Sequence, residues 1–276
     1  MTVRAPAPDR SAPHDSDAAE RRFKIRVALV WLAMLGLVVL AFQAFDLKTS
    51  LIVEKLPFLL GLRLTPNGFA QGLALTLLIT VCGMVCSIVL GVLCALGRIS
   101  RNPIAFGIAT FYASFFRGTP LLVQVLIIYL GLPPLGLVID ALPAGILALS
   151  LNYGAYLAEI FRAGILAVPA GQREAAMSLG LPRWLIAIKI IGPQAMRVIV
   201  PPTFTNFVSM LKDSSLVSVM GLWELNFLAQ SYGRASFRFM EMLLTAAVIY
   251  WCAAILLEIV QNRVERRFGK GFSTGK

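Results

Sequence analysis

Polar side chains that interrupt apolar stretches of this 276-residue chain are suited to hydrogen bonding a polar solute rather than to catalysis. Asn152 places an amide near the middle of one apolar run, and Glu159 follows seven residues later on the same helical face. Such groups are costly at bilayer depth and normally face protein or water. We therefore predict that Asn152 lies on a solute path and that Glu159 pairs with Arg162 at a helix end.

A second polar group interrupts the apolar region near residue 212. It carries one ammonium, one carboxylate and two hydroxyls, on Lys212, Asp213, Ser214 and Ser215. One interpretation is a solvated outer turn. The other is an outer gate or a half-buried ion pair beside the path, which the flanking apolar residues favour.

A third interruption, Arg117-Gly118-Thr119-Pro120, divides the apolar run of residues 103–132. Irregular backbone inside a bilayer persists only where protein covers it or where it faces water. One hypothesis is a helix break that lines a pathway. The alternative is a long tilted helix with a proline kink, in which Arg117 contacts a neighbouring loop.

The polar loop of residues 162–183 contains a predicted short helix. Pro169 suits a first helical turn, and Gly180 can end the helix in the left-handed conformation. A helix this short is not stable alone in water, so we expect an apolar face of Ala175, Ala176 and Leu179 to pack on something. One hypothesis is an amphipathic helix lying on lipid headgroups.

No arrangement of residues indicates an enzyme. The chain lacks the G-x-x-x-x-G-K-[ST] phosphate loop, paired carboxylates and a nucleophile elbow. His14 is the single histidine, so neither a histidine-based triad nor a metal centre is expected. The cysteines fall inside apolar runs and are interpreted as packing residues: Cys82, Cys86, Cys94 and Cys252. We expect no cofactor on this chain.

The composition predicts an all-α polytopic membrane protein. The chain is 58% hydrophobic and 14% charged, whereas a soluble domain carries about 25% charged residues. The apolar runs predict about six spans, at residues 27–45, 71–96, 103–132, 141–161, 184–210 and 237–261.

The basic residues predict the orientation of these spans. They gather at residues 21–26, 98–101, 162–183 and 263–270, which places both termini in the cytoplasm. The net charge of +11 is therefore topological, with attraction to membrane lipid as a by-product and no nucleic acid partner. Residues 1–26 are expected to be a disordered tail.

Several motifs resemble one transporter family. The run Glu174-Ala175-Ala176, with Gly180, Ile190 and Pro193 at set spacings, resembles the cytoplasmic signature of binding-protein-dependent ABC importer permeases. The family has Leu-Pro where this chain has Gly192-Pro193. Three further segments resemble its polar amino-acid branch (the histidine, glutamine and glutamate type), and they cover residues 116–124, 156–162 and 211–219.

The resemblance implies a five-helix permease core over residues 68–265. An additional N-terminal helix and outer loop would occupy residues 27–67, and a basic cytoplasmic tail residues 266–276. Glu174, Ala175, Ala176 and Gly180 would form a cytoplasmic coupling helix.

The resemblance also implies an assembly in the bacterial inner membrane. It would contain two ATPase subunits that hold ATP and magnesium, a second permease, identical or related, and an extracytoplasmic amino-acid-binding protein.

Two other functions are compatible with a polytopic chain. An ion-coupled secondary transporter would need ionisable groups inside its spans, for which Arg197 and Glu241 are the nearest candidates. A membrane scaffold would need no broken helix, so residues 117–120 weigh against it. The sequence does not select the solute.

Overall fold

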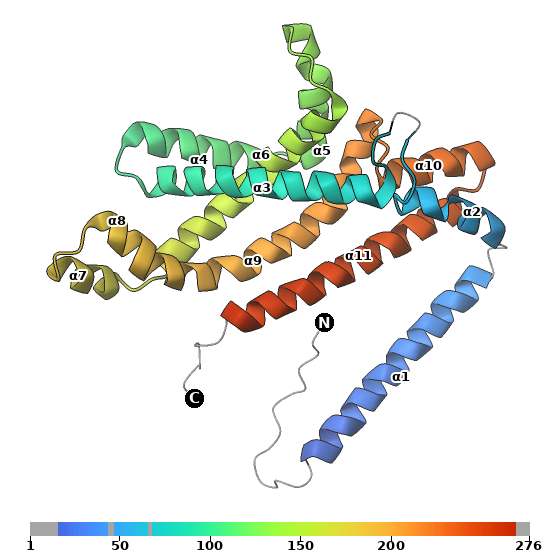
Figure 1. Cartoon of the computed structure of the whole chain (residues 1–276), viewed down its shortest axis with the longest axis horizontal. Helices are drawn as coiled ribbons and strands as arrows, with labels where there is room; N and C mark the ends of the chain where they lie inside the picture. The colour runs from blue at the N-terminus through green and yellow to red at the C-terminus, as the bar shows by residue number, and fades with distance from the viewer. Residues whose placement is uncertain (1–15, 44–46, 66–67, 269–276) are drawn as a thin grey trace. The chain divides into compact units, whose positions relative to one another are not determined.

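The computed structural model describes residues 16–43, 47–65 and 68–268. The chain divides into two units, residues 1–52 and 53–276, which are described separately. Figure 1 traces the helices along the chain.

The first unit contains helix α1 (Ser16–Gln43) and the start of α2 (Thr49–Leu59). The disordered tail predicted up to residue 26 is too long, because α1 begins at Ser16. Its first turns are rich in strong helix formers, and Lys24 pairs with Glu20 at 2.8 Å, one turn apart. Residues 1–15, 44–46 and 269–276 lie outside the described residues. The first predicted span falls mainly on α1.

The regular elements of the second unit are helices, joined by turns and loops, and its described residues contain one isolated β-bridge, between Gly72 and Glu224. Four stretches are long and apolar enough to cross a membrane, namely Gly72–Ile99, Ala141–Leu166, Arg183–Met220 and Phe239–Arg266. A bent pair of helices makes a fifth if it is one span. These stretches confirm the predicted all-α polytopic class, while the additional N-terminal span stays a prediction.

The centre of this unit is the crossing of α3 (Gly72–Ile99) and α6 (Ala141–Leu166). Glycines let the two helices approach closely. A Cβ atom built on Gly91 would lie 2.9 Å from the Cβ of Leu157, and one on Gly154 would lie 2.9 Å from the Cβ of Leu90. Small residues at such crossings are typical of membrane helices.

The third predicted span is broken rather than kinked. Helix α4 (Pro103–Gly118) is followed by α5 (Leu121–Leu126) and a π-helical turn, η1 (Ile127–Gly131), and the two parts differ in direction by 107°. Thr119 between them is extended. The alternative of one long tilted helix is therefore wrong, since Gly118 and Pro120 stop helix propagation.

The remaining elements follow in chain order. The 3-10 turn η2 (Pro133–Leu135) follows η1 and precedes α6 in the chain. After α6 come α7 (Ala170–Ser178), α8 (Arg183–Ile186), the π-helical turn η3 (Ala187–Ile191) and α9 (Gly192–Asp213). The 3-10 helix η4 (Ser214–Met220), α10 (Leu225–Ser236) and α11 (Phe239–Phe268) complete the chain. In Figure 1, α7 and α8 lie at the end of the unit opposite α10.

Candidate functional site

Helix α7 begins and ends at the residues predicted from the sequence. Pro169 caps its start, and Gly180 follows its end with a φ of +73°. The amide of Leu181 donates to the carbonyl of Ala176 at 3.2 Å, and the amide of Gly180 donates to that of Met177 at 2.9 Å. This pair of bonds is a Schellman motif, which satisfies carbonyls that the helix end would otherwise leave free.

The faces of α7 differ from the expected pattern. Ala176 is buried, but Ala175 is exposed and Leu179 is 79% exposed. The predicted apolar face is therefore reduced to one alanine. Glu174 and Ser178 are both exposed and lie one turn apart on the same face. That exposed face offers one carboxylate and one hydroxyl to whatever binds there.

The helix break after α4 is held by two amides. Gln124 donates to the carbonyls of Phe116 and Thr119 at 2.9 and 3.1 Å. Asn152, on α6, donates to the carbonyl of Phe116 at 3.0 Å and to the side-chain oxygen of Gln124 at 3.2 Å. These bonds satisfy backbone groups that the break releases from the helix. Asn152 is buried and has this structural contact, while its predicted role on the solute path stays a prediction.

A carboxylate on α6 holds three arginines. Glu159 accepts short hydrogen bonds from Arg98 and Arg162, and the guanidinium of Arg117 lies 3.6 Å from it. The Glu159–Arg162 pair confirms the predicted helix-end pair. Arg117 also lies over the ring of Tyr156, at 5.5 Å from its centroid. The break, α3 and α6 thus meet at one carboxylate.

The polar group around residue 212 is only partly exposed. Asp213 accepts a hydrogen bond of 2.6 Å from the hydroxyl of Tyr153. Ser214 is fully buried and donates to the carbonyl of Leu211. Lys212 is exposed, and the described residues contain no ion pair between Lys212 and Asp213. Ser215 is half-buried. Tyr153, a neighbour of Asn152, therefore connects the two predicted polar sites.

Glu224 is a buried group that the sequence analysis missed. It is fully buried at the start of α10 and accepts hydrogen bonds from the amides of Asn226 and Phe227 at 2.9 and 2.6 Å. The hydroxyls of Tyr250 and Thr76 also donate to it, at 2.8 and 3.4 Å. Burial raises the pKa of Glu224 to about 7, against the opposing effect of these donors. The sequence gives little indication that Glu224 is buried, because an acidic residue before a short helix normally indicates an exposed N-cap.

The part of the chain that the structure describes has no group of three or more metal-ligating side chains. All four cysteines are unpaired, and the buried Cys94 contacts the carbonyl of Ala109.

Comparison with known proteins places these features in a family. Residues 87–270 match the family model described as "Binding-protein-dependent transport system inner membrane component". The arginine transport system permease protein ArtQ of Bacillus subtilis is 38% identical over 223 residues, which cover 80% of this chain and 97% of ArtQ. The L-cystine transport system permease protein TcyB of the same organism is 38% identical over 200 residues, covering 72% of this chain and 86% of TcyB.

A solved structure has a similar fold. It is titled "Crystal structure of an amino acid ABC transporter with histidines", and the matched chain is 36% identical with a TM-score of 0.70. The match covers 79% of this chain and 97% of that chain.

Proposed function

The chain belongs to the family of inner membrane components of binding-protein-dependent transport systems, and from this premise we propose that it is the permease subunit of an ATP-driven importer of a polar amino acid. The observation that carries the proposal is the match over most of the chain to amino-acid permeases, one of them in a solved ABC transporter. The relatives are named for arginine and cystine, which supports the class of solute and leaves its identity open.

Energy reaches the spans from a separate ATPase in this proposal, because the sequence lacks a phosphate loop. Two ATPase copies hold ATP and magnesium. One of the two copies would bind the exposed Glu174 face of α7 in this chain, with Ala175 beside it. Buried Ala176 and the Gly180 end would transmit the movement to α6 and α8. Differential contact with two states of the ATPase is the physical requirement.

The solute path is proposed to pass the polar groups of α6 and α9. Tyr153 and Asp213 join the two helices there, and Asn152 and Ser214 lie next to them in sequence. Lys212 and Ser215 would face the outer opening, and the break at residues 117–120 would border the path. A second permease subunit would complete the path, and an amino-acid-binding protein would deliver the solute.

The basic ends of the spans support a bacterial inner membrane location with both termini in the cytoplasm. Nothing favours ion-coupled transport. Glu241, a candidate for that function, pairs with Arg238 at 3.2 Å at the start of α11, and Arg197 is exposed.

The test is co-purification of the ATPase with tagged permease from native membranes, together with ATP-dependent amino-acid uptake. Glu174→Ala removes the exposed carboxylate. Gly180→Pro cannot adopt a φ of +73° and loses the amide bond to Met177. We expect both variants to lose most of the bound ATPase and most of the uptake.

Two variants on the same helix are matched controls. Gln172→Ala changes an exposed side chain elsewhere on α7, and Gly171→Ala adds a methyl group where no atom lies within 4 Å. Both should keep ATPase binding. Normal ATPase binding and uptake in the Glu174 and Gly180 variants would contradict the coupling site. Uptake that needs no ATP would contradict the importer.

A further inference from the structure

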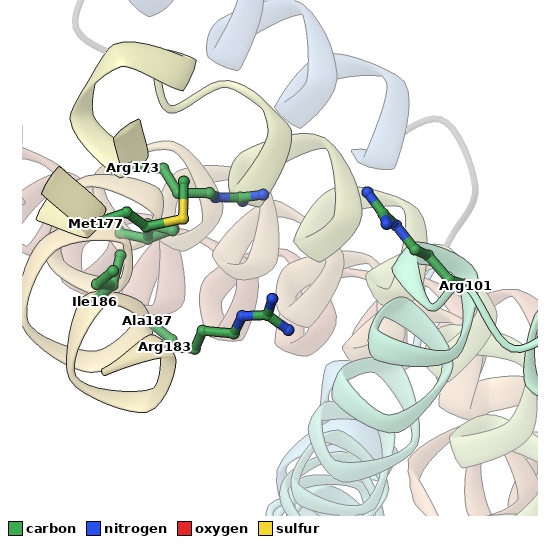
Figure 2. A pocket seen from close by; sticks show the side chains of 7 residues that line it. Arg101, Arg173, Met177, Arg183, Ile186 and Ala187 are labelled. Carbon is green, nitrogen blue, oxygen red and sulfur yellow. The ribbon is translucent and has the colours of Figure 1, made fainter. Parts of the chain in front are cut away.

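A pocket beside α7 gathers three arginines from three separate segments. Arg101 follows the end of α3, Arg173 lies on α7, and Arg183 begins α8. Figure 2 shows the guanidinium group of Arg101 pointing across the pocket toward those of Arg173 and Arg183. The cavity has a volume of about 460 Å³. It is large enough to hold a headgroup-sized ligand.

Within the part of the chain that the structure describes, these three cations have no carboxylate at ion-pair distance. Among the described residues, none of the three takes part in an ion pair or a side-chain hydrogen bond. Three converging guanidinium groups repel one another, and each presents a planar set of donors that matches the oxygens of a phosphate. The pocket is therefore suited to a phosphate-bearing anion.

The rest of the pocket is apolar. Its lining includes the buried Ile186 and Ile191. Met177 also lines it and lies beside Arg173 in Figure 2. Outside the lining but on the same helical stretch, Trp184 is 65% exposed and Ile188 is 61% exposed. A small soluble anion has no apolar groups to pack against this surface. The glycerol and acyl groups of a lipid can pack against it.

The pocket also lies beside the ends of two apolar stretches, where lipid headgroups are expected. Arg101 comes two residues after the end of one apolar stretch, and Arg183 is the first residue of another. Tryptophan, such as Trp184, is enriched at this interface. Arg173 and Glu174 are successive residues and point in different directions around α7, whereas Met177 lies one turn from both of them. The pocket therefore borders the coupling surface, and the test below separates the two.

We propose that Arg101, Arg173 and Arg183 form a binding site for the phosphate headgroup of an anionic phospholipid. Basic pockets between membrane helices bind such headgroups in other proteins. A lipid bound here joins α7 and α8 to the turn between α3 and α4. The site does not depend on the proposed transport function.

The experiment uses the full-length chain, delipidated in an uncharged detergent. Binding of phosphatidylglycerol and of phosphatidylcholine is measured by native mass spectrometry. We expect the chain to bind phosphatidylglycerol more tightly than phosphatidylcholine. Each single Arg→Gln substitution should weaken binding of phosphatidylglycerol about fivefold, and the triple substitution should weaken it at least about tenfold. A matched control, Lys189→Gln with Arg197→Gln and Arg263→Gln, removes three exposed charges outside the pocket and should change binding less than about twofold.

Three outcomes would overturn the proposal. In the first, the control and pocket variants weaken lipid binding equally, which means diffuse attraction. In the second, inorganic phosphate binds the three arginines as tightly as the lipid does, which means a soluble anion. In the third, the pocket variants bind the lipid normally but, in a separate experiment in lipid-free detergent, no longer bind the ATPase. That result would mean that the three arginines form a protein interface. Unchanged elution and thermal transition of the triple variant show that it is folded.

Discussion

Glu159 shows how one carboxylate can organise charges from several segments. Arg98, Arg117 and Arg162 surround it, from the ends of α3 and α4 and from α6 itself. These side chains are only partly exposed. Screening by water is therefore weaker than at a free surface.

We predict that Glu159→Gln lowers thermal stability clearly, because it leaves three neighbouring cations without their anion. The measurement is the unfolding temperature in detergent. Glu54→Gln is the control, since the Glu54 side chain is 65% exposed and pairs with Lys55 at 2.7 Å, where an ion pair contributes little. Equal, small shifts in both variants would show that the arginine cluster does not stabilise the fold.

Glu224 gives the fold a dependence on pH. Its pKa is about 7 in the folded chain and 4.5 in the absence of burial. The folded chain therefore binds this proton more tightly than the unfolded chain does. The stability that this proton contributes is fully present below about pH 4.5 and is lost as the pH rises through about 7.

We predict a decrease on the order of 3 kcal/mol in the free energy of unfolding across this range from Glu224 alone. Glu224→Gln, which has no proton to release, should flatten the profile of unfolding temperature against pH, although losing an acceptor lowers its overall level. Glu54→Gln should keep the original slope. A profile for Glu224→Gln as steep as that of the unsubstituted chain would contradict this origin.

At the scale of elements, the broken helix after α4 depends on amides from two places. Gln124 follows the break in sequence, and Asn152 reaches it from α6. A break in a membrane helix persists only when its released carbonyls find donors. Asn152 therefore has a structural task independent of any contact with the solute.

We predict that Asn152→Ala destabilises the chain by about 1–3 kcal/mol, because the buried side-chain oxygen of Gln124 loses its donor. The carbonyl of Phe116 also loses one of its two donors and keeps the one from Gln124. If the main role of Asn152 is to stabilise the helix break, the apparent KM for uptake stays unchanged while the amount of folded protein falls. Asn226→Ala is the control and should cost less, because it removes two longer hydrogen bonds, of 3.4 Å to the carbonyl of Ser215 and 3.3 Å to the hydroxyl of Ser218. A changed KM with normal stability would instead place Asn152 on the solute path.

At the scale of the whole molecule, the distribution of charge predicts which ends of the spans face the cytoplasm. In a cysteine-free background, Ser178→Cys on α7 should be protected from a membrane-impermeant maleimide in intact cells. Val138→Cys, at a position 80% exposed beyond η2, should be labelled. Lysed cells provide the control, in which both should react. The reverse pattern in intact cells would contradict the orientation.

The sequence by itself determined the helical membrane class, the limits of α7 and the position of the helix break. Apolar length, a proline and a glycine specify locally where these features begin and end. Their stability still depends on contacts with other elements. The family signature around Glu174 is also local, so it can be read without a structure.

Only the tertiary structure decided which groups meet. Asn152 joins Phe116 across 36 residues, Tyr153 joins Asp213 across 60, and Glu224 joins Thr76 across 148. The pocket likewise unites Arg101 with Arg173 and Arg183. Such pairs depend on helix crossings at small residues, and a single chain carries no local signal for where distant helices cross. For the same reason the burial of Glu224 and the exposure of Leu179 became visible only once the helices were packed.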